Sequence, residues 1–376
     1  MIPSHDVAIV GAGPAGLASS RELARAGIDH RVLERGPDVA HTWANLYDSL
    51  VLHTGKHLSA LPGMPFPAST PLFPSRKAFV EYLRQYASRF QVPVDTGTDV
   101  AAVVRDAGAW TLRTTQGKDL RAGAVIMATG IVANPYVAEI PNRDRFRGAV
   151  VHSVDYRRPG TFAEKRVLVV GAGNSAGEIS VDLAGAGARV TVAVRSGARV
   201  VPLRMLGIPI QYFAVALSRL PRGMQRRIQL AIGRVSEHVR GGPVLPHPVA
   251  SDCSPVPLIG FHLVDAIQAG AILLREGVEE FTTDGVRFVN GVEESFDHVI
   301  LATGFRAALK PLGRLVRLDP CGFASRRNRV VSVDQPGLYF VGHNYDTRGG
   351  LRNIGQDARL AATLIARSRG VARGDE

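Results

Sequence analysis

The stretch DVAIVGAGPAG, residues 6–16, decides the fold. Its first five residues are mostly apolar and predict a strand, and a helical pattern follows over residues 17–26. The glycines between them have separate tasks: Gly11 permits a tight turn, Gly13 lets a pyrophosphate approach the backbone, and Gly16 lets the helix pack close to the strand. The helix N-terminus then faces the phosphates. The stretch therefore predicts the first turn of an α/β dinucleotide-binding domain.

A second strand, His30 to Leu33, ends in Glu34, which lies 18 positions after Gly16. An acid at this place hydrogen-bonds a ribose hydroxyl of the bound nucleotide. A GxGxxG motif alone is a weak signal, but here strand, turn, helix and acid all occur in order. We interpret this first copy as an FAD site.

The same unit returns in RVLVVGAGNSAGEI, residues 166–179. Residues 166–170 predict a strand and residues 189–194 the next one, which ends in Arg195. Arg195 lies 18 positions after Gly177, so a guanidinium replaces the carboxylate of the first copy. A planar fork of donors suits the 2′-phosphate of NADPH, which a carboxylate would repel. The alternative interpretation of Arg195 is a solvated charge at a strand end.

Two dinucleotide sites of opposite ribose chemistry imply one bound flavin and one exchangeable nicotinamide. Residues 124–130 and 297–304 are both apolar strands that end in Ala-Thr-Gly, and we interpret them as crossings between two domains. The predicted fold is α/β, with two Rossmann-like domains of the two-dinucleotide-binding flavoprotein type. Residues 1–145 and 295–376 form a split FAD domain, and residues 146–294 form the NADPH domain.

After a predicted strand at residues 337–342, a helix is expected to open near Gly355 and Gln356 and to aim its N-terminus at the flavin's pyrimidine edge. Residues 201–248 form an insertion into the NADPH domain, and Pro209 and Pro221 divide it into short helical pieces. It is expected to be a lid over the flavin, a dimer contact or a basic amphipathic helix on a membrane surface.

Composition limits the partners. The 376 residues carry a formal charge of +12, but Lys and Arg are scattered, which argues against nucleic-acid binding. No apolar stretch reaches the roughly 18 residues of a membrane span, and no signal peptide is recognised, so we expect a cytoplasmic protein without stable membrane insertion. Cys253 and Cys321 have neither metal nor redox spacing, which disfavours a disulfide reductase.

The most specific further match is FRGAVVHSVDY, residues 146–156, which resembles the FxGxxxHxxx(Y/F) fingerprint of the flavin-containing monooxygenases. Trp43, residues 52–56, residues 61–67 and residues 297–305 also resemble that family, over nearly the whole chain. Within it the chain is most similar to the plant auxin-forming, YUCCA-like type. One departure is Phe305, where the family motif DxxxLATGY has Tyr.

The resemblance implies a class B flavoprotein monooxygenase in which NADPH reduces FAD, oxygen forms a C4a-hydroperoxyflavin, and a small organic substrate is oxygenated. Animal members carry Asn where this chain, like the plant group, has His53. The expected reaction is therefore N- or S-oxygenation or oxidative decarboxylation of an aryl pyruvate, and the histidine argues against oxygenation of the animal kind. His53 and Trp43 are the expected residues beside the reacting centre; both also fit a role in core packing, and His152 of the fingerprint fits a buried structural histidine.

The expected cofactor-binding residues are those of the two glycine turns, the strand ends and the last helix: Gly11, Gly13, Pro14, Ala15, Gly16, Glu34, Arg35, Trp43, His53, Thr129, Gly130, Gly171, Gly173, Asn174, Ser175, Gly177, Arg195, Ser196, Ala302, Thr303, Gly304, Gly342 and Gln356. No metal is expected, and the partners are a small-molecule substrate and O2, with a homodimer as a further possibility. The rival functions are an NADPH oxidase or quinone reductase and a redox-sensing flavin-binding protein.

Overall fold

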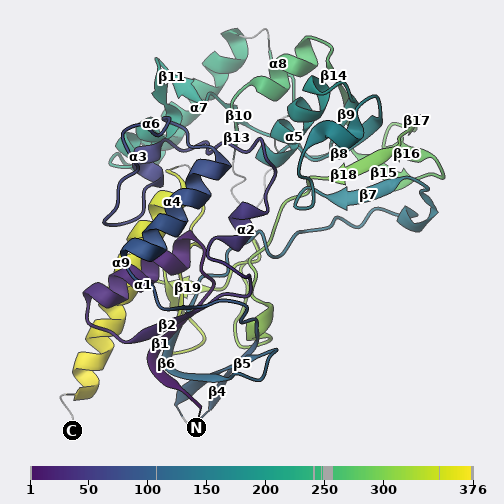
Figure 1. The fold of residues 1–376 in the computed structure, drawn as a ribbon. Helices are drawn as coiled ribbons and strands as arrows, with labels where there is room; N and C mark the ends of the chain where they lie inside the picture. Colours follow the sequence, from purple (N-terminus) through teal and green to yellow (C-terminus); the bar gives the residue numbers. More distant parts are fainter. Residues whose placement is uncertain are drawn as a thin grey trace. The chain divides into compact units, whose positions relative to one another are not determined.

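A computed structural model describes residues 2–106, 108–239, 242–246, 248, 257–346 and 348–373. The chain forms two compact units (Figure 1). The first unit contains Met1–Asn45, Thr54–Asn134 and Arg306–Glu376, and the second contains Leu46–His53 and Pro135–Phe305.

The first unit begins with the strand, turn and helix of the opening motif. β1 (Ser4–Val10) leads into α1 (Pro14–Arg25), and β2 (His30–Leu33) follows and pairs in parallel with β1. On its other side β1 pairs in parallel with β6 (Leu120–Met127). A nine-stranded sheet results, in the order β19-β20-β21-β6-β1-β2-β3, with β5 joining β4 to β6.

The remaining elements of the first unit are short strands at the sheet edges and helices that pack on the sheet or on one another. They are α2 (His41–Ala44), α3 (Lys56–Ser59), α4 (Arg76–Arg89), β3 (Val94–Asp95), β4 (Val100–Asp106), β5 (Ala109–Thr114), η3 (Lys310–Leu312), β19 (Arg326–Arg327), β20 (Val331–Ser332), β21 (Leu338–Phe340) and α9 (Gly350–Arg373). In Figure 1, α1, α4 and the yellow α9 run side by side, and α1 contacts both.

Burial explains why these segments become strands and helices. Val7, Ala8 and Ile9 of β1 are fully buried on both faces, as expected of a central parallel strand covered by helices. Leu17 and Leu23 give α1 its buried stripe.

The second unit is built on a five-stranded parallel sheet in the order β14-β9-β8-β18-β7. Its strands are β7 (Ala149–His152), β8 (Arg166–Val170), β9 (Arg189–Val194), β14 (Ile272–Glu276) and β18 (His298–Leu301). α5 (Asn174–Gly185) connects β8 to β9, so the second copy of the motif has the predicted strand–turn–helix–strand form.

The other elements of the second unit surround that sheet. They are η1 (Arg143–Arg145), η2 (Pro159–Phe162), β10 (Val200–Val201), β11 (Arg204–Met205), β12 (Ile208–Pro209), α6 (Ile210–Leu217), α7 (Arg222–Val239), β13 (Leu258–Ile259), α8 (His262–Gln268), β15 (Val278–Phe281), β16 (Gly285–Phe288) and β17 (Glu293–Ser295). The described residues of the insertion contain two helices, and each begins directly after a predicted boundary, Pro209 or Pro221. With 18 residues, α7 is not the short helical piece that was expected.

Three expectations need correction. The unit boundaries fall at 134/135 and 305/306, a few residues after each Ala-Thr-Gly, and not at 145/146 and 294/295. Residues 46–53, assigned to the first domain, belong to the second unit because their side chains bond to α5. α9 begins at Gly350 and not near Gly355, because Asn353 N already donates to Gly349 O at 3.1 Å.

Among the described residues, none of the helices has the length and apolar character of a membrane span.

Candidate cofactor sites

The first glycine turn has the local geometry that a bound pyrophosphate needs. Gly11 has φ +103°, and a Cβ there would lie 2.8 Å from the carbonyl oxygen of Ala128. A Cβ on Gly16 would overlap the Gly11 carbonyl, so α1 approaches the turn as closely as glycine allows. A Cβ on Gly13 would meet nothing within 4 Å. The space in which the pyrophosphate is expected to lie is therefore open.

The start of α1 leaves donors for an anion. Gly13 caps the helix without a side chain, and Pro14 is its first residue. Proline has no N–H to leave unpaired, while the N–H groups of the next residues, including Ala15, have no partner within the helix. Free N–H groups and the helix dipole favour a phosphate at this end. The first turn therefore fits the FAD pyrophosphate.

Glu34 is buried, with 7% of its surface exposed, and it braces this turn. Its Oε2 accepts from Ala12 N at 2.7 Å and its Oε1 accepts from Gly36 N at 2.8 Å. A carboxylate oxygen can accept more than one hydrogen bond, so Glu34 remains able to accept from a ribose hydroxyl. Arg35, the next residue, is exposed.

Other predicted residues of the first unit lie at the carboxyl ends of its strands. Thr129 follows β6 and donates from Oγ1 to Ala308 O at 2.7 Å, and Gly130 has φ +62°. Gly342 follows β21 with φ +84°, and a Cβ there would lie 3.0 Å from the Cβ of Ala15. The end of β21 thus adjoins the first turn of α1.

Gln356 does not occupy the predicted place. It is exposed in the second turn of α9 and not at the helix N-terminus. The free N–H groups of this helix belong to the residues from Gly350 onward.

Sequence reasoning missed a buried polar network beside α9. Asp357 is fully buried, and it accepts from Arg329 Nε at 2.9 Å and from Asn344 Nδ2 at 2.6 Å. Burial raises the pKa of its carboxyl group. His343 is also buried, and within the described residues neither of its ring nitrogens has a hydrogen-bond partner; burial lowers its pKa to about 3. The bonds of Asp357 join residues that are far apart in sequence, so no local sequence motif indicates them.

The second glycine turn repeats the geometry of the first. Gly171 has φ +133° and lies against the Ala302 carbonyl, while a Cβ on Gly173 would meet nothing within 4 Å. A Cβ on Gly177 would lie 3.0 Å from Leu258 Cδ1. This turn is therefore open in the same place as the first.

The side chain of Asn174 is occupied by the protein itself. Its Nδ2 donates to Pro257 O at 3.1 Å, and its Oδ1 accepts from Ile259 N at 2.8 Å. The amide therefore fixes residues 257–259 over the start of α5, and phosphate contacts are left to backbone N–H groups and to Ser175, which is partly exposed.

Arg195 and Ser196 are exposed directly after β9. Within the described part of the chain, Arg195 has no side-chain hydrogen bond or ion pair. A cation at a strand end without a protein partner is suited to an anionic ligand such as a 2′-phosphate.

The end of β18 is bound to the fingerprint segment. Thr303 Oγ1 donates to Tyr136 O, and Gly304 O accepts from His152 Nε2 at 3.2 Å. The His152 ring also meets Phe305 edge-on, at 5.1 Å between centroids. Burial lowers the pKa of His152. The geometry thus agrees with the structural interpretation of this histidine.

Trp43 and His53 lie in different units. Trp43, on α2, packs edge-on against Phe79 at 4.7 Å between centroids and is partly exposed. His53 lies at the end of residues 46–53 and bonds through Nε2 to Glu178 of α5. Each side chain has a packing partner and keeps some exposed surface.

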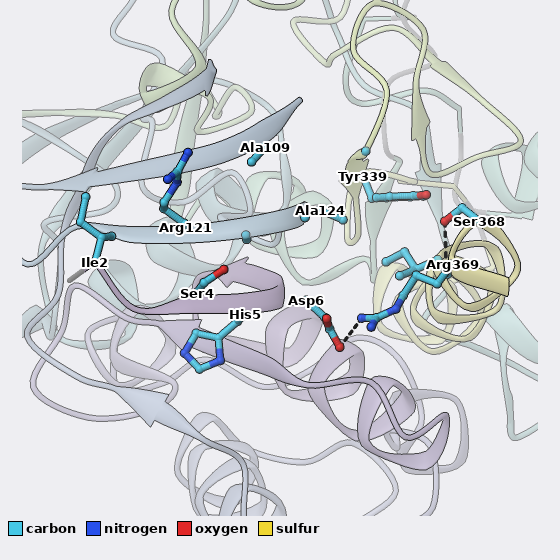
Figure 2. Close-up of a pocket in the computed structure, with 14 residues that line it drawn as sticks. Ile2, Ser4, His5, Asp6, Ala109, Arg121, Ala124, Tyr339, Ser368 and Arg369 are labelled. Carbon is cyan, nitrogen blue, oxygen red and sulfur yellow. Dashed lines mark hydrogen bonds and ion pairs between the residues drawn. The ribbon is translucent and has the colours of Figure 1, made fainter. Parts of the chain in front are cut away.

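One cavity lies away from both glycine turns. It has a volume of about 1050 Å³ and lies at the amino ends of β1 and β6 beside the last turns of α9, at the opposite end of β1 from Gly11. Figure 2 shows Asp6 and Arg369 paired there. Among the described residues, no group of three or more His, Cys, Asp or Glu side chains is placed to hold a metal ion. Cys321 is not a free thiol, and Cys253 lies outside the described residues.

Three comparisons place the chain among known proteins. A profile of the pyridine nucleotide-disulphide oxidoreductase family matches residues 8–202, more than half of the chain. The indole-3-pyruvate monooxygenase YUCCA1 of Oryza sativa subsp. japonica is 36% identical over 95% of this chain and 90% of its own length.

Solved structures agree on the fold. A flavin-containing monooxygenase from Stenotrophomonas maltophilia superposes with a TM-score of 0.78 at 24% identity, covering 97% of this chain and 99% of that one. Cyclohexanone monooxygenase from Rhodococcus sp. Phi1 bound to NADP⁺ gives a TM-score of 0.74 at 18% identity, over 100% and 86% of the two chains. The two glycine turns, the fingerprint and these similarities agree: the chain belongs to the YUCCA-type flavin-containing monooxygenases, and it is a flavin-dependent monooxygenase with FAD and NADPH as cofactors.

Proposed function

We propose that the chain catalyses the oxidative decarboxylation of an aryl pyruvate such as indole-3-pyruvate. One observation carries this proposal, namely the extensive similarity to the rice enzyme whose name states that substrate. His53, which the resemblance associates with the plant group, is in accord with it.

FAD is assigned to the first unit and NADPH to the second. The open space at Gly13 and the brace at Glu34 support the first assignment. The open space at Gly173 and Arg195, which has no hydrogen bond or ion pair to a described residue, support the second. FAD, once reduced by NADPH, supplies the activation of O2, and such chemistry belongs to the cofactor.

The chain's own residues bind and orient the cofactors. The first turns of α1 and α5 each present backbone N–H groups to a pyrophosphate, so orientation does not depend on flexible side chains. Trp43 and His53 are proposed to lie beside the reacting groups and to exclude water, which would otherwise divert oxygen to peroxide.

The overall reaction balances with one aryl pyruvate, one O2, one NADPH and one proton, giving an aryl acetate, CO2, water and NADP⁺. The test is to measure NADPH, O2, peroxide and product with indole-3-pyruvate, phenylpyruvate, an amine and a thioether. One aryl acetate per NADPH with either pyruvate, and little peroxide, supports the proposal. Oxygenation of only the amine or thioether contradicts the substrate class. Stoichiometric peroxide with every compound indicates an oxidase.

Three further assignments accompany this proposal. Residues 201–248, which contain α6 and α7, are proposed to select the substrate as a lid. A homodimer and a cytoplasmic location are proposed from sequence alone. Light scattering of the purified protein tests the first of these two, and cell fractionation tests the second.

A further inference from the structure

Residues 46–53 are fastened to one face of α5. The Tyr47 hydroxyl donates to Oε2 of Glu178, and His53 Nε2 bonds to Oε1 of the same carboxylate. One helical turn further, Asp182 accepts from Ser49 Oγ at 3.0 Å. Residues four apart share a helix face, so the two acids form one row that holds the segment. All of these residues belong to the second unit.

The Glu178 end of this row is largely enclosed. Tyr47 is 6% exposed, and the side chains of His53 and Glu178 are 21% and 15% exposed. Burial and the neighbouring Glu178 raise the pKa of Tyr47, so its hydroxyl remains a donor. His262 lies near the same carboxylate, and burial lowers its pKa. The glutamate is the fifth residue of α5, one turn in from the helix N-terminus.

The bond to Glu178 favours one tautomer of a neutral His53 ring. An ionised carboxylate only accepts hydrogen bonds, so Nε2 of His53 must carry the hydrogen that lies toward Glu178. In a neutral imidazole the other nitrogen is then an acceptor, because the bond made by one ring nitrogen sets the role of the other. Nδ1 makes no hydrogen bond to the described residues, so it is the atom left for a ligand.

We infer that Glu178 is a positioning residue, which holds His53 with Nε2 as donor and presents Nδ1 as an acceptor to substrate or cofactor. The N-cap of the same helix is Gly173, the open glycine of the second turn. One rigid element therefore carries both the nucleotide turn and the anchor of His53. The inference rests on the proposed function only in giving His53 a place beside the reacting groups.

Asp182 provides a matched control. It lies on the same helix face and accepts from Ser49 Oγ and from Tyr156 Oη, the latter at 2.7 Å, and among the described residues it has no hydrogen bond to an imidazole. A purely structural role for the row predicts equal effects at both acids. A positioning role predicts that only Glu178 variants change the state of His53.

The first experiment reads the tautomer directly. Holoenzyme labelled with ¹⁵N-histidine is studied by long-range ¹H–¹⁵N NMR at pH 9, where a free imidazole is neutral, and His53→Gln assigns the signal. His53 is expected to be protonated at Nε2 in the unsubstituted enzyme and in Asp182→Asn. A mixture of tautomers is expected in Glu178→Gln. The double variant Tyr47→Phe/Glu178→Leu, which also removes the Tyr47 hydroxyl that would lose its acceptor, is expected to do the same.

The second experiment measures aryl acetate formed per NADPH. In the Glu178 variants the amount of aryl acetate formed per NADPH is expected to fall about tenfold, the equivalent of one hydrogen bond. Adding His53→Gln to a Glu178 variant should lower this ratio no further. Asp182→Asn should retain the coupling of the unsubstituted enzyme. The inference is overturned if both Glu178 variants keep the Nε2 tautomer, or if Asp182→Asn loses as much as they do. If the unsubstituted enzyme forms no aryl acetate, the substrate proposal fails, and the NMR result still decides the role of Glu178.

Discussion

Replacing Gly13 with alanine separates cofactor binding from folding. Gly13 has φ −79° and ψ −172°, a conformation open to any residue, and its new Cβ would meet no protein atom within 4 Å. The apo protein should therefore be unharmed. A Gly→Ala change at a compatible position stabilises a protein by about 0.4–1 kcal/mol, because the unfolded chain has less freedom to lose.

The effect on FAD is expected to be large. The methyl group would occupy the space in which the pyrophosphate approaches the backbone, and it would displace a phosphate from the first N–H groups of α1. Each charge-assisted hydrogen bond lost weakens binding by about 1.5–3 kcal/mol. The dissociation constant of FAD should rise roughly 10- to 150-fold per bond.

Gly173→Ala is the matched control, because Gly173 has φ −85° and ψ −179° and is equally open. Calorimetric titration of the apo protein with FAD, and of the holoenzyme with NADP⁺, compares the two variants. Gly13→Ala should weaken FAD alone, and Gly173→Ala should weaken NADP⁺ alone. Unchanged FAD affinity in Gly13→Ala, or equal losses for both nucleotides in both variants, would refute the reasoning.

Three other variants test single contacts. Arg195→Ala should weaken NADPH by about 1–3 kcal/mol and NADH far less in binding titrations; equal losses would contradict a role with the 2′-phosphate. His343→Phe should remove part of the loss of folding stability at low pH. Burial holds the pKa of His343 near 3 in the folded protein, below its value in the unfolded chain. Folding is therefore favoured above the pKa of the unfolded chain, and this contribution to the free energy of unfolding is lost as pH falls. Between pH 7 and 5 the unsubstituted protein should lose about 2 kcal/mol more than the variant in denaturant unfolding, and identical pH dependence would argue against this. Gly16→Ala should lower the melting temperature with or without FAD, because its Cβ overlaps the rigid Gly11 backbone; loss of FAD affinity alone would not fit.

Elements with a strong local signal could be predicted from sequence. β8 and β9 have the predicted bounds, because runs of β-branched residues between glycine or charged boundaries leave little alternative to a buried parallel strand. The boundaries between the two units fall at 134/135 and 305/306, shortly after the two Ala-Thr-Gly segments, and the sequence-based bounds at 145/146 and 294/295 differ from them. The conformations of Gly11 and Gly16 follow from the motif alone.

Features that depend on tertiary partners could not be predicted. Residues 46–53 have no periodic pattern, and their attachment to the second unit depends on Glu178 and Asp182, more than a hundred residues away in sequence. The Gly349–Gly350 pair resembles a loop, yet α9 starts there. The bonds of Asp357 to Arg329 and Asn344 were missed for the same reason: a buried carboxylate looks like any helical acid until its partners are known.

Oxygen-isotope transfer tests the central claim most directly. The FAD-loaded enzyme is given NADPH and indole-3-pyruvate under ¹⁸O2, and the acid product is analysed by mass spectrometry. The account predicts one ¹⁸O atom in the aryl acetate carboxylate for each NADPH consumed. An unlabelled product, or ¹⁸O recovered only in hydrogen peroxide, would contradict it.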